Sequence, residues 1–332
     1  MKKKILFIGT GGTIASEISD EGIHPNIDAE MLLSYAPKIR EICDVDCVSL
    51  YNLDSSNLTP RHWVGIAKEI EKNFDAYSGF VISHGTDTMA YTAAALSYMI
   101  QKSPKPIILT GAQKPIGFDI TDSKTNLSDS FTCASDDDMH GLMIVFNGNV
   151  ISGLRARKTR SKTFDAFESI NYPLLARVVD GRIQKYIMQD YAEKPIFKTT
   201  LGEGVALMKL YPGLKTEDIE YYIKNYRALI VESFGTGGLP EYCDSEHIFK
   251  LLDAQEKFLV MTTQVQHEGS DLSRYKTGKS LKMHPRVLEA YDMTTEAAFA
   301  KIMWILAQTG DFSEIKRIFY TPCGVDLLSS LA

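Results

Sequence analysis

Two threonines stand where a side-chain hydroxyl could do chemistry. Thr13 follows the apolar run Ile5–Ile8 in the segment ILFIGTGGTIAS, and Thr86 follows the run Phe80–Ser83 in FVISHGTDTMA. Each run has the composition of a buried strand, and a helix-like segment follows each threonine. Because open α/β sheets bind ligands at the carboxyl ends of their strands, we expect both hydroxyls at that edge of one sheet.

A hydroxyl becomes an effective nucleophile only when a neighbouring group accepts its proton. Asp87 stands beside Thr86, and lysines follow further along the chain. We therefore interpret the pattern as a hydrolase with a threonine nucleophile. Asp87 or Thr88 could also serve only to cap the predicted helix Met89–Ile100. The local sequence favours neither capping nor catalysis.

Two more polar segments follow predicted strands in the same way, Asp54-Ser55-Ser56 after residues 46–53 and Gly111-Ala112-Gln113 after residues 106–110. Their strands would end at the same edge of the sheet as those before Thr13 and Thr86. Four polar tips at one edge favour a shared ligand site over four unrelated turns.

The glycines of GTGGTI have to be weighed as a nucleotide-binding turn. A dinucleotide fingerprint needs a third glycine where Ile14 stands, and a P-loop needs Gly-Lys-Ser/Thr, which is missing. The glycines are then explained by a tight strand-to-helix turn. The seven histidines show no metal-ligand spacing, and His84 is interpreted as a hydrogen-bonded structural residue. We expect no metal and no cofactor.

Composition places the chain among ordinary globular proteins. It has 332 residues, 44% of them hydrophobic and 23% charged, which predicts more than one domain. A net charge of -6 does not favour a nucleic-acid partner. Five scattered cysteines without a C-x-x-C pair are typical of reduced thiols, so we expect a cytoplasmic protein. The N-terminal apolar run is too short for a signal peptide, and no segment is long enough to span a membrane.

Alternating strand and helix patterns predict an α/β fold with a parallel sheet. We expect a larger N-terminal α/β catalytic domain over residues 1–188, an interdomain linker over 189–202 and a smaller C-terminal α/β domain over 203–332. Asp28, Thr59 and Asp122 are the predicted caps of three helices in the first domain.

Several segments together resemble one family. The stretches GTGGTIAS, LDSS, HGTDTMAYT, ILTGAQ and GLRARKTRSKTFDAFESINYP are similar to those of the bacterial-type, two-domain L-asparaginases, and most of all to the intracellular (type I) branch. The resemblance extends into the C-terminal half, through ESFGTGGLP and TTQVQHEGSDLSRYKTG. It implies hydrolysis of L-asparagine to L-aspartate and ammonia, and a homodimer or homotetramer.

The resemblance also implies roles for individual residues. Thr13 matches the nucleophile that forms an acyl-enzyme, and Thr86, Asp87 and Lys158 match a second threonine, an acid and a base. The implied substrate-binding residues are Asp54, Ser55, Ser56, Gly85, Thr86, Asp87 and Ala112, the last through its backbone. Many relatives carry a tyrosine after a glycine in the loop that follows the first strand, whereas here Gly22 precedes Ile23.

Lysine is an awkward base, because it is ordinarily protonated at neutral pH and a neighbouring carboxylate favours the protonated form. We therefore predict that Lys158 is charged at rest and holds Asp87 in place. It would accept the Thr86 proton only when closure and desolvation of the site weaken that ion pair.

Two alternatives remain open. One is the subunit that releases ammonia for transamidation of misacylated tRNA, which shares this core but normally has an extra N-terminal domain. The predicted first strand begins at Lys4, and we expect no such domain. The other is a regulator that binds an amino acid or a nucleotide without turnover. Minor glutaminase activity is also expected, because one methylene changes binding by only ~1–3 kcal/mol.

Overall fold

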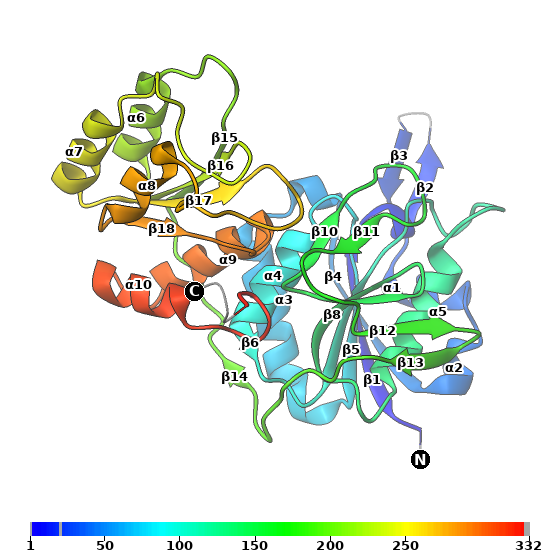
Figure 1. The fold of residues 1–332 in the computed structure, drawn as a ribbon. Helices are drawn as coiled ribbons and strands as arrows, with labels where there is room; N and C mark the ends of the chain where they lie inside the picture. Colours follow the sequence, from blue (N-terminus) through cyan, green and yellow to red (C-terminus); the bar gives the residue numbers. More distant parts are fainter. Residues whose placement is uncertain (1, 20–21, 329–332) are drawn as a thin grey trace. The chain divides into compact units, whose positions relative to one another are not determined.

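The structure is a computed structural model that describes residues 2–19 and 22–328. The side chains of residues 17–25, which include Ile23, lie outside the described part. The chain divides between Thr199 and Thr200 into two compact units, which are described separately (Figure 1).

The N-terminal unit is built on a sheet of eight strands in the order β13-β12-β9-β8-β7-β5-β1-β4. Strands β8, β7, β5, β1 and β4 run parallel to one another, whereas β9 is antiparallel to β8, β12 to β9 and β13 to β12. The parallel strands are β1 (Lys4–Gly11), β4 (Asp44–Leu53), β5 (Gly79–Ser83), β7 (Pro106–Thr110) and β8 (Gly141–Phe146). The antiparallel ones are β9 (Asn149–Ser152), β12 (Ala176–Val179) and β13 (Arg182–Lys185).

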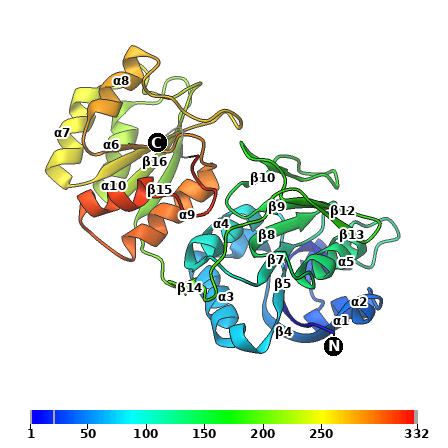
Figure 2. The ribbon, with the colours of Figure 1, turned by 60° about the horizontal axis from the view of Figure 1, so that its bottom comes forward.

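Helices cover both faces of this sheet, as Figure 2 shows. On one face lie α1 (Ala29–Ser34), α2 (Ile39–Ile42) and α5 (Ser123–Ala134). On the other lie α3 (Pro60–Asn73) and α4 (Met89–Met99). All five residues of β5 and all five of β7 are buried. Their continuous apolar runs predicted this, because such runs are typical of strands covered on both faces of a sheet.

Strand order decides where the polar tips meet. Strand β1 lies between β4 and β5, and β7 follows on the far side of β5. The chain passes from β1 to β4 on one side and then crosses to β5 on the other, so the direction of winding reverses between β1 and β5. Open α/β sheets bind ligands at such a switch point, beyond the carboxyl ends of the strands. Thr13 and Thr86 follow the two strands that flank it.

Short strand pairs surround this edge. The strands β2 (Ser16–Ser19) and β3 (Gly22–Pro25) follow the Thr13 turn, and β10 (Ala156–Lys158) pairs antiparallel with β11 (Phe167–Ser169). Short 3-10 helices begin at Thr13, Ser55 and Phe74. Part of the predicted linker forms β14 (Ile196–Phe197), which pairs with β6 (Ile100–Gln101) of the N-terminal unit.

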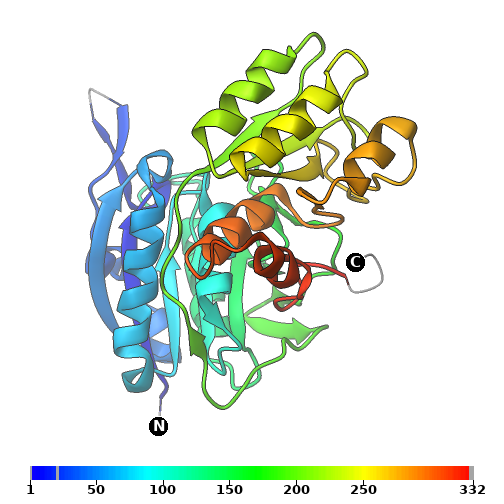
Figure 3. The same cartoon turned by 90° about the vertical axis from the view of Figure 1, so that its left-hand side faces the viewer.

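The C-terminal unit repeats the design on a smaller scale. Its parallel sheet has the order β15-β16-β17-β18, formed by β15 (Val205–Lys209), β16 (Ala228–Ser233), β17 (Phe258–Thr263) and β18 (Val287–Glu289). Figure 3 shows α6 (Thr216–Asn225) and α7 (Ser245–Gln255) on one face, with α9 (Thr295–Leu306) and α10 (Phe312–Tyr320) on the other. A further helix, α8 (Lys276–Met283), precedes β18.

The predicted fold class is confirmed, with a larger α/β unit built on a mainly parallel sheet and a smaller one built on a parallel sheet. The Asp28 carboxylate caps α1 by accepting from the Met31 N–H at 2.8 Å. Asp122 stands at the N-cap position of α5, as predicted, but its carboxylate accepts no capping hydrogen bond from a backbone N–H of that helix. Across the described residues, none of the helices combines the length and the hydropathy that a membrane crossing requires.

Candidate active site

Three turns at the carboxyl edge of the N-terminal sheet pack backbone against backbone. A side chain on Gly12 would place its Cβ 2.3 Å from the Gly85 nitrogen, and one on Gly85 would meet Ser55 at 2.6 Å. Gly12 also has a φ of +79°, which disfavours any other residue, and its N–H donates to the Leu53 carbonyl at 2.9 Å. These glycines therefore bring the turns after β1, β5 and β4 into direct contact.

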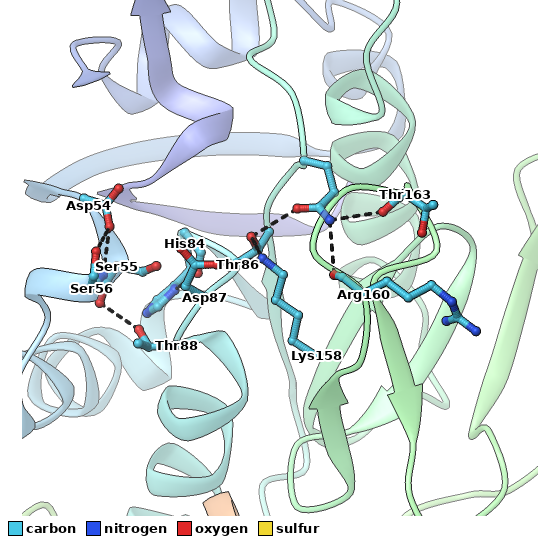
Figure 4. Close-up of polar contacts among 12 residues, drawn as sticks. Asp54, Ser55, Ser56, His84, Thr86, Asp87, Thr88, Lys158, Arg160 and Thr163 are labelled. Carbon is cyan, nitrogen blue, oxygen red and sulfur yellow. Dashed lines mark hydrogen bonds and ion pairs between the residues drawn. The ribbon is translucent and has the colours of Figure 1, made fainter. Parts of the chain in front are cut away.

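Lys158 joins the two side chains that follow Gly85. Its Nζ donates to Thr86 Oγ1 and to Asp87 Oδ1, both at 2.7 Å (Figure 4). Thr86 is buried, whereas the Asp87 side chain is 66% exposed and that of Lys158 17% exposed. Solvent therefore reaches the Asp87 carboxylate more easily than it reaches the Thr86 hydroxyl. The structure thus brings together three of the four predicted catalytic residues.

Strand β10 positions the lysine. Lys158 is its last residue and lies opposite Phe167 of β11. The loop between these strands is held by Arg160, whose guanidinium pairs with Glu168 at 2.8 Å and with Asp165 at 3.4 Å. Lys158 therefore reaches the Thr86 turn from a braced hairpin rather than from a free loop.

Thr13 begins the turn after β1 and is partly exposed. Among the described residues, neither Thr86 nor Lys158 is hydrogen-bonded to its hydroxyl. What places Thr13 in the site is the backbone contact between Gly12 and Gly85, each of which immediately precedes a candidate threonine. Its role as nucleophile stays a prediction.

Asp54 and its serines form the opposite side of the site (Figure 4). Asp54 Oδ1 accepts from the Ser56 backbone N–H at 2.8 Å and from the Ser56 hydroxyl. Ser55 is 2% exposed, and its carbonyl accepts from the Thr88 hydroxyl at 2.8 Å. Neither Asp87 nor Thr88 caps α4, since the first binds Lys158 and the second binds the Ser55 carbonyl.

His84 is a structural residue of the Thr86 turn, as its sequence context indicated. Its Nδ1 lies 2.6 Å from the Gly85 carbonyl, which can only accept, so this nitrogen carries the proton. The Nε2 atom then accepts from the Thr92 hydroxyl at 2.8 Å. Complete burial lowers the pKa of His84 to about 4, and the imidazole is neutral at physiological pH.

The turn after β7 supplies Ala112 and also Gln113, to which the sequence analysis gave no individual role. Ala112 is fully buried with its side chain in the apolar core, which leaves only its backbone for a ligand. Gln113 places its Oε1 3.3 Å from Thr86 Oγ1 and its Nε2 3.1 Å from the Thr163 carbonyl. The signal was present in the sequence as a polar tip after a buried strand, but the partners of Gln113 lie 27 and 50 residues away.

Asp122 holds this turn in place. Its carboxylate accepts the backbone N–H groups of Gln113, at 2.9 and 3.1 Å, and of Lys114, at 3.1 Å. Burial raises the pKa of Asp122, although the two N–H groups act in the opposite direction. Across residues 2–19 and 22–328, no group of three or more His, Cys, Asp and Glu side chains is placed to hold a metal ion.

Two family models match the chain. The model described as "Asparaginase, N-terminal" matches residues 4–190, and the one described as "Glutaminase/Asparaginase C-terminal domain" matches residues 204–319. The chain belongs to the asparaginase family. The resemblance read from the sequence is therefore confirmed.

Relatives within the asparaginase family carry two kinds of name. The solved structure of the thermostable L-asparaginase from Thermococcus kodakarensis is 35% identical, with a TM-score of 0.92 over 98% of this chain and 99% of that one. L-asparaginase I from Vibrio cholerae is 29% identical, with a TM-score of 0.85 over 99% and 100%. A subunit of the glutamyl-tRNA(Gln) amidotransferase of Pyrococcus horikoshii is 36% identical over 335 residues, which are 96% of this chain and 75% of that protein.

Proposed function

We propose that this protein is an L-asparaginase, which hydrolyses L-asparagine to L-aspartate and ammonia through an ester on Thr13. The observation that carries the proposal is the Lys158 ammonium, 2.7 Å from both Thr86 Oγ1 and Asp87 Oδ1. It lies in an asparaginase-family chain, at the switch point of a parallel sheet. A hydroxyl, a potential base and a carboxylate within hydrogen-bonding distance are the groups that activation of an attacking water requires.

The reaction divides into two halves. In the first, the Thr13 oxygen attacks the side-chain amide carbon, the carbon–nitrogen bond breaks, and the hydroxyl proton leaves with the nitrogen as ammonia. In the second, water attacks the ester and regenerates the Thr13 hydroxyl. In this proposal Thr86 activates that water, taking its proton while passing its own to Lys158. The bond between the carbonyl carbon and the Thr13 oxygen then breaks, and that oxygen is protonated as Lys158 gives its proton up again. Backbone N–H groups of the glycine turns are the candidate donors to the oxyanion.

The α-carbon of asparagine carries one positive and one negative charge. Asp54 and Asp87 are the proposed receptors for its ammonium group, and the hydroxyls of Ser55 and Ser56 for its carboxylate. An ammonium bound to Asp87 would compete with Lys158 for the same carboxylate. Substrate binding would then favour loss of the lysine proton, because the lysine loses its counter-charge and gains a neighbouring cation.

The remaining parts of the proposal concern context. We place the enzyme in the cytoplasm as a homodimer or homotetramer, acting on a free amino acid without a cofactor and without nucleic-acid or membrane partners. Glutamine is a minor substrate. Residues 1–188 carry the proposed catalytic domain, 189–202 the linker and 203–332 the C-terminal domain.

Ammonia release tests this function. The purified protein is incubated with L-asparagine, with L-glutamine or with buffer, beside the variants Thr13→Val and Thr13→Ser. We expect release from asparagine in the wild type, weaker release from glutamine, none with Thr13→Val and reduced release with Thr13→Ser, which keeps a hydroxyl. Absence of release from both amides in the wild type would overturn the proposal.

A second function is favoured by the relatives named as glutamyl-tRNA(Gln) amidotransferase subunits, of which Pyrococcus horikoshii supplies an example at 36% identity. A protein that feeds ammonia to transamidation would respond to the acceptor. The assay is therefore repeated with glutamyl-tRNA(Gln) added. Release that depends on the tRNA would favour this second function. Binding of asparagine without release under either condition would favour the binding-only regulator.

A further inference from the structure

Gln113 connects two segments that the proposed reaction needs to keep in register. Its Oε1 lies 3.3 Å from Thr86 Oγ1, at the start of the turn before α4. Its Nε2 lies 3.1 Å from the Thr163 carbonyl and 3.4 Å from the Arg160 carbonyl, both in the loop that follows Lys158. One half-buried amide thus bridges the hydroxyl and the hairpin that carries the lysine.

The two carbonyls fix the orientation of this amide. A backbone carbonyl can only accept a hydrogen bond, so the nitrogen of Gln113 must face Arg160 and Thr163. Its oxygen then faces Thr86, and because that oxygen also only accepts, the Thr86 hydroxyl must donate to it. The proton of Thr86 is committed to Gln113, and Lys158 must be the donor to Thr86 Oγ1.

Proton directions therefore run one way through the cluster at rest. Lys158 donates to both Asp87 and Thr86, and Thr86 donates to Gln113. This is the arrangement expected of a charged lysine, and in it the Thr86 proton points away from the group that should receive it. Rotation about the Cβ–Oγ bond of Thr86 redirects the proton to Lys158 without moving the oxygen.

We propose that Gln113 is a positioning residue for this hydrolysis, one that anchors the Thr86 oxygen against the Lys158 hairpin so that only the proton has to move. The inference rests on the proposed L-asparaginase function. Gln113 has no place in the proposed binding of the α-carbon groups. Its loss is therefore expected to lower kcat and to leave KM nearly unchanged, since misplacement of about 1 Å at a reacting group costs on the order of 10²-fold.

Two substitutions at this position separate positioning from simple support of the fold. Gln113→Met keeps the length of the side chain and removes every hydrogen bond. Gln113→Glu keeps an acceptor for Thr86, and its protonated form can also donate to the Thr163 carbonyl, as the amide does. The ionised form faces two carbonyl oxygens and adds a negative charge near Lys158, which favours the charged lysine.

Lys114→Met is the matched control. The Lys114 ammonium lies 5.7 Å from the centre of the Phe164 ring, so Lys114 also braces the loop after Lys158. Among its contacts, none involves Thr86, Asp87 or Lys158 in the described part of the chain. A loss of activity that came only from loosening this loop would appear in Lys114→Met as well.

The test measures kcat and KM for asparagine between pH 5 and pH 8, with the thermal midpoint of each variant as a check on folding. We expect Gln113→Met to lose about 10- to 100-fold in kcat, with KM changed less than about threefold. For Gln113→Glu, kcat relative to the wild type should rise by about fivefold or more between pH 8 and pH 5, because protonation restores the amide-like pattern. Lys114→Met should stay within about twofold of the wild type.

Three results would overturn this inference. The first is a Gln113→Met variant with wild-type kcat, and the second is a kcat for Gln113→Glu that keeps a constant ratio to the wild type at all pH values. The third is an equal loss in Lys114→Met. A wild type that releases no ammonia from asparagine is a different result, because it overturns the proposed function and this inference with it.

Discussion

Two lysine–aspartate ion pairs of nearly equal length lie in opposite environments of this protein. Lys158 and Asp87 are 2.7 Å apart at the carboxyl edge of the N-terminal sheet, with side chains 17% and 66% exposed. Lys301 and Asp326 are 2.6 Å apart in the C-terminal unit, and both side chains are completely buried. The distance between the charges is therefore not what distinguishes the two pairs.

The two ion pairs differ in whether solvent can separate their charges. Lys301 also donates to the Thr321 carbonyl at 3.1 Å, and Asp326 accepts from the Cys323 N–H at 2.9 Å. This pair connects α9 to the segment after α10. If one partner is removed, the charge that remains is buried and cannot be solvated by water. The Asp87 carboxylate, in contrast, is open to solvent and can exchange its lysine for water or, in the proposed function, for the ammonium group of asparagine. An ion pair that can open suits proton transfer, and one that cannot suits stability.

Breaking the exposed pair should have the largest effect, and the effect should be on turnover. Lys158→Met removes the proposed base, and we expect kcat to fall by about 10³-fold or more, equivalent to about 4 kcal/mol of barrier. The partner left behind, Asp87, is well solvated, so the free energy of unfolding should change by less than about 1 kcal/mol. Steady-state kinetics and urea unfolding measure the two quantities. Near-normal turnover in the folded variant would remove lysine from the mechanism.

Breaking the buried pair should reverse this profile. Lys301→Met leaves the Asp326 charge uncompensated in the interior, which is expected to cost about 3–5 kcal/mol of unfolding free energy. The molecules that remain folded should keep wild-type kcat. Urea unfolding followed by circular dichroism gives the first number, and kcat per folded molecule the second. Unchanged stability would show that burial does not determine the role of the pair.

A third carboxylate sharpens the comparison because it is largely buried and, in the described part of the chain, no lysine is paired with it. Asp129 on α5 is 8% exposed, and burial raises its pKa to about 6. Its pKa in the unfolded chain is about 3.9, so the native state holds the proton more tightly. Stability is therefore lost as the pH rises from about 4 through 6 and does not return above it.

Replacing this carboxylate by an amide should remove that loss. The difference of about two units between the folded and unfolded pKa values of Asp129 corresponds to at most roughly 3 kcal/mol of unfolding free energy. Because solvent still reaches the site, we expect Asp129→Asn to raise the unfolding free energy at pH 8 by about 1–2 kcal/mol. At pH 4 the two proteins should be equally stable. Unfolding curves at both pH values decide this, and an identical difference at pH 4 and pH 8 would contradict titration of Asp129 as the cause.

The smallest expected effect is the coupling between the members of the exposed pair. A double-mutant cycle with Asp87→Asn and Lys158→Met, read out by unfolding free energy, should give a coupling below about 1 kcal/mol. The same cycle with Asp326→Asn and Lys301→Met should give several times more. Equal couplings would mean that the two environments do not differ in the way proposed.

The sequence predicted the parts of the site that follow from strand endings. Apolar runs followed by Thr13, Asp54, Thr86 and the Gln113 turn identify polar tips at the ends of strands, and glycines mark the tight turns. Which tips are neighbours depends on strand order, and that order is set by crossover connections that local patterns do not encode.

Other parts depend on contacts between distant segments. Lys158 was identified through family resemblance alone, since its strand is three residues long and its partner Thr86 lies 72 residues away. Asp122 looked like a helix cap because such residues commonly are, yet its carboxylate binds the turn after β7 instead. The sequence could not predict the role of Gln113 either, because the carbonyls that orient its amide belong to the distant loop that follows Lys158.

The most direct test of the account is to find the atom that carries the acyl group. The enzyme is mixed with excess asparagine, quenched in acid during turnover and digested, and the peptides are mapped by mass spectrometry. The account predicts an aspartyl ester on the peptide that contains Thr13, absent in Thr13→Val. An ester on the peptide that contains Thr86, or turnover by Thr13→Val at the wild-type rate, would contradict it.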